Sequence, residues 1–514
     1  MKINRKKNSI RNAIWGYTSK LIGLIMPFIF RTIVIYCLGN EYLGLNSLFT
    51  SILQVLSLSE LGIGAAIVYS MYEPIANNDS KTINCLLNLY RKVYRVIGII
   101  ILVIGLCITP FLTSLIEGSY PNEINIYAIY LLFLLNTVIS YLLFGYRSAL
   151  LYAFQRNDLD SKINAITSIL LYAISSAAII VTNNYYSYLI ILILATIVNN
   201  ILHLLVTKKV MPNFKCEGKV SEKNKKIIRK NVVALMCHKI GGIILNSTDN
   251  IIISMFLGLV VLAKYTNYYY VMNSVASLII ICFTGLTAGI GNSLKTESIE
   301  KNTDYFKKIL FLNGYIVIVC GTLLFTLYQD FIKLWVGNDN LLPYIIMILF
   351  VVYFYVRMIR RTIIVFRDAS GMWWDNKFQP IISAILNLSL NIILTKIIGL
   401  YGIITSTIIS MLFIDIPWES IVFLRQKIKI KPKKYFYEIF CYFVVMVICC
   451  AICYVLNSFI VITSSLIIHL ICNLIINFIV INLIVYILFC KNENYNYFRK
   501  MTISTARRFL KKKN

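Results

Sequence analysis

Apolar segments of membrane-spanning length recur along almost the whole of this 514-residue chain. A helix needs about 20 mostly apolar residues to cross the hydrocarbon core of a bilayer. Charged residues make up only 14% of the chain and gather between the apolar segments. We therefore predict an all-α polytopic membrane protein with about fourteen transmembrane helices. The predicted spans are residues 14–38, 43–70, 93–116, 124–146, 163–182, 186–206, 232–257, 264–291, 309–328, 342–366, 378–397, 401–424, 436–457 and 462–489.

The distribution of basic residues predicts the orientation of these spans. Lysine and arginine are retained on the cytoplasmic side of membrane proteins. If the N-terminus is cytoplasmic, the inner segments and helix ends hold 43 of the 50 lysines and arginines. An odd number of spans would scramble this asymmetry. We therefore expect both termini to lie in the cytoplasm.

An internal repeat predicts two lobes. Shifting the chain by 219 positions superposes Lys20 on Lys239 and Gly23 on Gly242, among other matches between the first and seventh spans. Six spans separate the repeats, so they share one orientation and are related by an axis along the membrane normal. The predicted division is an N-lobe at 1–206, a basic linker at 207–231, a C-lobe at 232–424, two further helices at 425–489 and a basic tail at 490–514.

Polar residues in the first span recur at helical spacing. Gly16, Lys20, Gly23, Pro27 and Arg31 are separated by 4, 3, 4 and 4 residues, which places them on one helix face. A charge that faces lipid is costly, so this face is expected to meet protein or a water-filled cavity. Snorkelling to the headgroups is an alternative for Lys20, and it applies equally to its repeat counterpart. Pro27 removes a backbone hydrogen bond, so it and Gly23 are hinge candidates.

Lys20, Arg31 and Lys239 are the candidates for binding an anionic group inside the membrane. Glu60, Asp249 and Asn250 are the candidates for gating or ion coupling. By helical rise, Arg31 and Asp249 lie at similar depths, about 10–12 Å below the outer surface. We predict that they pair while the outer gate is closed. The alternatives are that Arg31 binds carbonyls of its own lobe and that Glu60 belongs to a packing or hinge element.

The net charge of +28 does not predict nucleic-acid binding, because the chain contains no compact basic domain. Basic residues beside apolar spans attract anionic phospholipids instead. The three histidines show no metal-site spacing, and no cofactor is expected. A coupling ion, proton or sodium, remains open.

Four segments carry a resemblance to a known family: LGNEYLGL at 38–45, LSLSELGIG at 56–64, TDNIIIS at 248–254 and FRDASGMWWD at 366–375. In this order, within fourteen spans, they resemble the polysaccharide-transporter family, specifically Wzx-like repeat-unit flippases. That family belongs to the MOP superfamily, together with the MATE multidrug extruders. The resemblance implies two six-helix bundles in a V around a central cavity, plus two C-terminal helices.

The resemblance also implies a function. Such proteins move undecaprenyl-diphosphate-linked oligosaccharides to the outer leaflet of the bacterial cytoplasmic membrane, for capsule, exopolysaccharide or O-antigen synthesis. They perform no covalent chemistry, so no catalytic residues are expected, and polysaccharide polymerase machinery is an expected partner. The alternatives are a peptidoglycan-precursor flippase, a MATE-like drug or cation antiporter, and a membrane polymerase or ligase. Short outer loops oppose the enzyme, and cationic residues in the first span oppose the cation antiporter.

Overall fold

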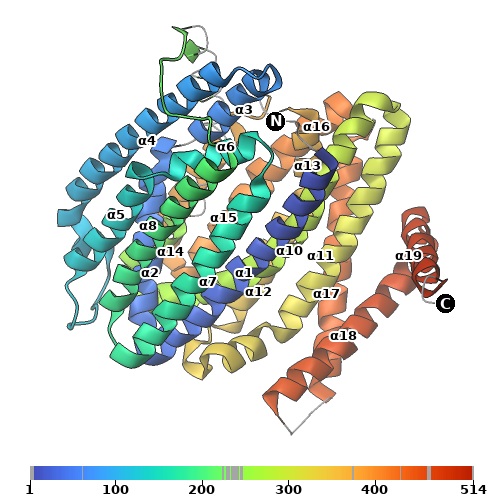
Figure 1. Cartoon of the computed structure of the whole chain (residues 1–514). Coiled ribbons are helices and arrows are strands. Elements are labelled where there is room, and N and C mark those ends of the chain that lie inside the picture. The colour runs from blue at the N-terminus through green and yellow to red at the C-terminus, as the bar shows by residue number, and fades with distance from the viewer. Residues whose placement is uncertain are drawn as a thin grey trace. The chain divides into compact units, whose positions relative to one another are not determined.

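The computed structural model is built of helices (Figure 1). The residues that the structure describes are 5–60, 62–222, 225, 226, 228, 232, 242, 247–372, 375–428, 430–459 and 465–511. The chain forms two compact units, Met1–Ala263 and Lys264–Asn514. Within the described ranges, ten helices are long and apolar enough to cross a membrane, or up to eleven if a bent pair at Ile126–Leu142 and Gly145–Ala153 is one span. The protein is therefore a multi-pass membrane protein.

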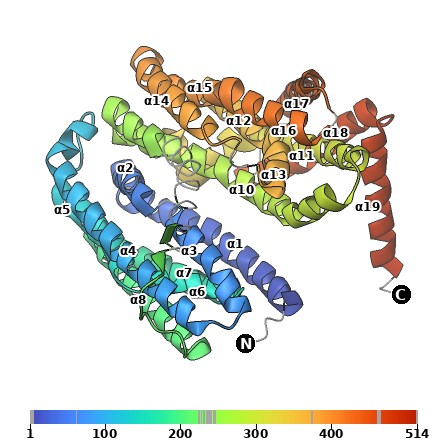
Figure 2. The ribbon, with the colours of Figure 1, turned by 90° about the horizontal axis from the view of Figure 1, so that it is seen from above.

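The first unit is a bundle in which helices both near and far apart in the sequence pack together. Helix α1 packs along α7, α7 along α8, and α4 along α5 (Figure 2). Phe30 of α1 lies between Tyr172 and Tyr188, with ring centroids 5.4 and 4.6 Å away. The elements are α1 Arg5–Cys37, α2 Asn40–Leu56, η1 Ser57–Glu60, α3 Ile63–Ala76, α4 Ser80–Ile108, η2 Thr109–Leu115, α5 Ile126–Leu142, η3 Gly145–Arg147, α6 Ser148–Ala153, α7 Asn157–Thr182 and α8 Tyr185–Val210.

The predicted span 43–70 is not one continuous helix. Helix α2 ends at Leu56, the 3₁₀ turn η1 follows, and α3 begins at Ile63. Gly62, which precedes α3, has φ +80°, a left-handed conformation that favours glycine. This break in the helix places Glu60 at a turn inside the bundle.

The second unit is arranged around α11, which packs against α12, α17 and α18. Helices α14 and α15 form a hairpin, and α15 also packs on α12 (Figure 2). The elements are α10 Leu259–Thr296, which starts in the first unit, α11 Ile299–Val336, η4 Asn338–Asn340, α12 Tyr344–Ile359, α13 Arg361–Ser370, α14 Gln379–Ile398, α15 Leu400–Ser410, the π-helical segment η5 Met411–Asp415, α16 Ile416–Lys427, α17 Pro432–Phe459, α18 Leu466–Phe489 and α19 Glu493–Lys511.

Two predicted spans of this unit contain irregularities. The span 342–366 divides at Arg360 into α12 and α13. The span 401–424 contains the π-helical segment, which ends two residues before Pro417. A proline inside a helix lacks an N–H and crowds the carbonyl four residues earlier. A π-turn relieves this conflict, and such turns are frequent at functional sites.

The boundary between the two units lies at 263/264. The predicted lobe division, which begins the C-lobe at 232, therefore stays a prediction, because most of 232–246 lies outside the described residues. The first part of the predicted linker, residues 207–222, packs against the first unit. The Asn88 side chain donates to the Gly218 carbonyl at 2.8 Å, and Met211 and Val220 are buried against α3, α4 and α6.

Replacing Gly402 with alanine is expected to destabilise the α14–α15 hairpin. A Cβ atom at this position would lie 2.4 Å from the backbone carbon of Leu394, so the two helices must move apart. Overpacking of this kind costs about 1–3 kcal/mol. Thermal unfolding of the purified protein should show a lower midpoint. Gly16→Ala is the control, because a Cβ there meets no atom within 4 Å. Equal midpoints for the two variants would contradict the packing.

Candidate functional site

The polar residues of the first span lie on α1, which continues without interruption through Pro27. Lys20 and Gly23 are exposed, whereas Pro27 and Arg31 are half-buried. A Cβ at Gly23 would meet nothing within 4 Å, so this glycine does not serve close packing in this structure. The hinge at Gly23 and Pro27 remains a prediction.

Arg31 lies on α1 near Tyr172 of α7, and the two side chains interact electrostatically. Asp249 is buried, with 5% of its surface exposed. Lys239 lies outside the described residues. The pairing of Arg31 with Asp249 and the anion-binding roles of Lys20, Arg31 and Lys239 therefore stay predictions.

The segment 247–258 is held to α2 and η2 by a row of hydrogen bonds, which we call the polar clasp. Ser247 donates to the Gln54 side chain at 3.1 Å, and Asn250 donates to Ser51 Oγ at 2.8 Å. Further along, Ser254 Oγ donates to the Leu115 carbonyl at 2.8 Å. Asn250 is a predicted gating residue, and its partner Ser51 cannot be identified from the sequence.

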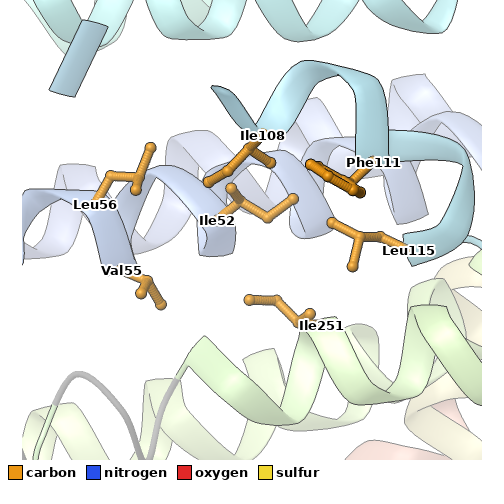
Figure 3. A pocket seen from close by; sticks show the side chains of 7 residues that line it. All are labelled: Ile52, Val55, Leu56, Ile108, Phe111, Leu115 and Ile251. Carbon is orange, nitrogen blue, oxygen red and sulfur yellow. The ribbon is translucent and has the colours of Figure 1, made fainter. Parts of the chain in front are cut away.

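A small apolar cavity of about 310 Å³ lies beside the polar clasp (Figure 3). Side chains of α2, η2 and the end of α4 line it from one side, and Ile251 faces them from the clasp segment, as Figure 3 shows. The cavity is lined by Ile52, Val55, Leu56, Ile108, Phe111, Leu115 and Ile251. The segment 247–258 therefore contacts α2 and η2 through the hydrogen bonds of the polar clasp. Beside these bonds, the cavity separates Ile251 from the side chains of α2 and η2.

Glu60 is held by tyrosines. The Tyr94 hydroxyl donates to Glu60 Oε1 at 2.5 Å, and the Tyr141 hydroxyl donates to Oε2 at 2.7 Å. The Tyr90 hydroxyl donates in turn to Tyr94 at 2.8 Å. The absence of a side chain at Gly64 leaves space for the Tyr90 hydroxyl, since a Cβ at this position would lie 2.6 Å from it. We call these four residues, with Glu60 as acceptor, the tyrosine cage: Glu60, Tyr90, Tyr94 and Tyr141.

The tyrosine cage links the turn at η1 to α4 and α5. An ionised carboxylate can only accept hydrogen bonds, whereas a protonated one also donates. The cage thus connects Glu60, at the break between α2 and α3, to α4 and α5.

The second unit contains a buried charge network that the sequence analysis did not identify. Arg360 donates through Nη1 to Asp415 at 2.5 Å and through Nη2 to Glu419 at 3.0 Å. Arg367 also binds Glu419, at 2.6 Å, and the Gln379 side chain donates to Asp415. The Asp415 and Glu419 side chains are only 2 and 3% exposed. The network joins α12, α13, α14 and α16 across the π-helical segment.

Arg357, one turn before this network, has different surroundings. Its Nη2 donates to Asn273 of α10 at 3.0 Å, and Tyr269 and Tyr353 lie within electrostatic reach. Among the described residues no carboxylate pairs with Arg357, and its buried Nη1 has no hydrogen-bond partner. In the predicted orientation, Arg357 is one of the basic residues at the inner helix ends. Arg357 lies 13 residues after the start of α12, about 20 Å by helical rise, and therefore lies within the predicted span 342–366.

Within the described ranges, no group of three or more His, Cys, Asp or Glu side chains could hold a metal ion. Two acidic residues at the start of α7 have structural partners. Asp158 pairs with Arg11 at 2.8 Å and Arg156 at 3.0 Å, which ties α1 to α7. Asp160 accepts from the Tyr152 hydroxyl and contacts His203.

Comparison with known structures shows the fold. The chain is similar to "Lipid II flippase MurJ, inward closed conformation", with 16% identity, a TM-score of 0.64 and coverage of 94% of this chain and 99% of that one. It is similar to an inward-facing multidrug resistance MATE family transporter of the MOP superfamily, with 12% identity, a TM-score of 0.62 and coverage of 82% and 95%. A MOP superfamily transporter from Pyrococcus furiosus matches with 13% identity, a TM-score of 0.52 and coverage of 82% and 94%.

Sequence comparison assigns the family. A search of curated protein sequences finds no significant match. The profile of the family described as "Polysaccharide biosynthesis protein" matches residues 9–287, which is more than half of the chain and includes α1, α2, the tyrosine cage and the polar clasp. The chain belongs to this polysaccharide biosynthesis family and has the fold of the MOP superfamily.

Proposed function

We propose that the protein flips undecaprenyl-diphosphate-linked oligosaccharide repeat units from the inner to the outer leaflet of the bacterial cytoplasmic membrane. The family match supports a role in polysaccharide synthesis, and the fold is that of transporters that include a lipid II flippase. The product would supply capsule, exopolysaccharide or O-antigen assembly, with polysaccharide polymerase machinery as the next partner.

The observation that carries this proposal is the environment of Arg357 inside a membrane-spanning helix. Arg357 is enclosed by tyrosines and an asparagine, and no described carboxylate neutralises it. An uncompensated cation inside the membrane is costly and marks a functional site. A diphosphate would supply the missing negative charge, and guanidinium groups bind it through paired hydrogen bonds. Within the first unit, Arg31 and Lys20 on α1 are the proposed anion-binding residues.

A reconstituted translocation assay tests this proposal. Purified protein in vesicles should move a lipid-diphosphate oligosaccharide between leaflets, and Arg357→Gln should slow the movement by about tenfold or more, the loss expected for a charged hydrogen bond. Arg425→Gln is the matched control, because Arg425 is exposed. Transport of a cationic drug instead of the oligosaccharide would identify a MATE-like antiporter. Transport of lipid II alone would identify a peptidoglycan-precursor flippase.

We further propose that Glu60 in the tyrosine cage couples transport to an ion, with the proton as the first choice. The cage supports this role because its only acid accepts hydrogen bonds from two different helices. A glutamine at position 60 cannot bind or release a proton. Transport by the Glu60→Gln variant should therefore lose its response to an imposed pH gradient. A sodium gradient serves as the parallel arm, and an unchanged response to both gradients would reject the coupling role.

The polar clasp is the proposed gate, and locking it should stop transport. If 247–258 must separate from α2 in each cycle, a disulfide between Ser51→Cys and Asn250→Cys should reduce translocation by about tenfold or more, with recovery under reductant. The parent protein under the same oxidant controls for the native cysteines, and mass spectrometry verifies the cross-link. Full activity of the cross-linked protein would show that the clasp does not open.

The proposed orientation places both termini and residues 207–231 in the cytoplasm. A maleimide reagent that cannot cross the membrane should therefore label Ser221→Cys above the parent background only after permeabilisation. Labelling of this variant in intact cells would overturn the orientation.

A further inference from the structure

Helix α19 begins directly at the end of the last membrane-spanning helix. Helix α18 ends at Phe489, and α19 starts at Glu493 after a short turn. The Asn492 side chain accepts hydrogen bonds from the backbone N–H groups of Asn494 and Tyr495, at 2.9 and 3.3 Å. Asn496 donates back to the Cys490 carbonyl at 2.9 Å. These bonds fix the turn, so α19 is an ordered continuation of α18 rather than a loose tail.

The first two turns of α19 are anchored to α11. Phe311 of α11 lies 6.2 Å from the Tyr495 ring and 6.5 Å from the Phe498 ring, measured between centroids. Lys308 lies over the Tyr497 ring at 4.4 Å. Phe311 stands at the start of an apolar span, and Lys308 stands just before it. This contact therefore places the beginning of α19 at the boundary between the hydrocarbon core and the headgroups.

The sequence of α19 is amphipathic. Tyr495, Phe498 and Thr502 are separated by 3 and 4 residues, and so share one helix face. Lys500 lies on a different face, and the sequence that follows is basic, with Arg507, Arg508 and Lys511. Residues 491–514 contain eight basic residues and one acidic residue. Tyr497 and Ile503 remain 47 and 45% exposed, so packing within the second unit does not cover the whole helix.

We propose that α19 is a docking helix for anionic lipid headgroups, which lies on the membrane leaflet at this end of α18. Tyr495 and Phe498 hold the start of α19 on α11, whereas the exposed Tyr497 and Ile503 are available to the acyl boundary. The basic residues of such a helix are presented to headgroup phosphates. The charge of the segment complements an anionic surface, and its anchored end already lies at the right depth. This inference is independent of the transported substrate.

Hydrogen exchange of the full-length protein in lipid nanodiscs tests the docking. Amides of 493–511 should exchange about tenfold more slowly in phosphatidylcholine discs that contain phosphatidylglycerol than in phosphatidylcholine alone. Because the attraction is electrostatic, 0.5 M salt should remove most of the difference. The triple variant Lys500→Glu, Arg507→Glu and Arg508→Glu should lose the difference while the helices of the bundle keep their protection.

A matched variant separates local docking from net charge. Lys219→Glu, Lys225→Glu and Lys226→Glu make the same charge change in 207–231, and this variant should keep the lipid dependence of α19. The proposal would be overturned if the amides of 493–511 exchanged at the same rate in the two lipid compositions. It would also be overturned if both triple variants lost the lipid dependence to the same extent. Protection of α19 that appears only with an added protein partner would also overturn it, and would assign the basic face to that partner.

Discussion

Replacing Arg360 with methionine should destabilise the protein by about 3–5 kcal/mol, the cost of leaving buried charges without their partner. Asp415 would then keep only the Gln379 side chain from the network, and Glu419 would keep only Arg367. Both carboxylates are nearly inaccessible to solvent, so water cannot replace the lost guanidinium. Thermal unfolding in detergent should show a large decrease in the midpoint, and the amount of protein in membranes should fall.

Two further variants make this prediction specific. Arg425→Met removes an exposed arginine of the same unit and should leave the midpoint nearly unchanged. The double variant Arg360→Met with Asp415→Asn removes both charges of one pair and should recover part of the loss, because no unpaired carboxylate then remains at 415. A midpoint for Arg360→Met equal to that of the parent would show that the network contributes little to folding.

Replacing Arg31 with alanine should abolish oligosaccharide translocation while the protein still inserts and folds. Arg31 is half-buried on α1 and is the proposed first-unit partner of the diphosphate. Lysine at this position keeps the charge but lacks the planar fork of donors, so Arg31→Lys should recover only part of the activity. Export of surface polysaccharide in cells and translocation in vesicles provide two independent measurements.

The predicted pairing of Arg31 with Asp249 is tested by the same assays. Asp249→Asn should change the balance between inward- and outward-open states, because a charge pair can shift that balance only if it differs between the two states. Arg425→Gln is the comparison variant, since Arg425 is exposed and belongs to no proposed binding site. Near-normal export by Arg31→Ala would show that Arg31 only binds groups of its own helix bundle.

The sequence alone predicted the helical membrane architecture, because this depends on chain-local properties. Long apolar segments can satisfy their backbone in a bilayer only as helices, and most predicted spans appear as helices of the expected length. The separation of 163–182 from 186–206 at Asn183 to Tyr185 is confirmed by α7 and α8, which end and begin there. The order of short motifs also predicted the family, which the match over 9–287 confirms.

The interruptions of the helices were not predicted, because they depend on partners far away in the chain. The break at η1 gives Glu60 access to Tyr94 and Tyr141, which are 34 and 81 residues distant. Periodicity shows that Glu60 lies in an apolar span, but it cannot show which hydroxyls meet it. A single-sequence prediction therefore identified the residue and left its function open between coupling and packing.

The arginines of α12 show the same limit. The sequence establishes that Arg357 and Arg360 are basic residues near the inner end of an apolar span. Only tertiary packing decides that Arg360 meets Asp415 and Glu419, whereas Arg357 meets tyrosines and Asn273. The physical reason is that the free energy of a charge inside a membrane depends on the groups within a few ångströms of it, and those groups come from other helices.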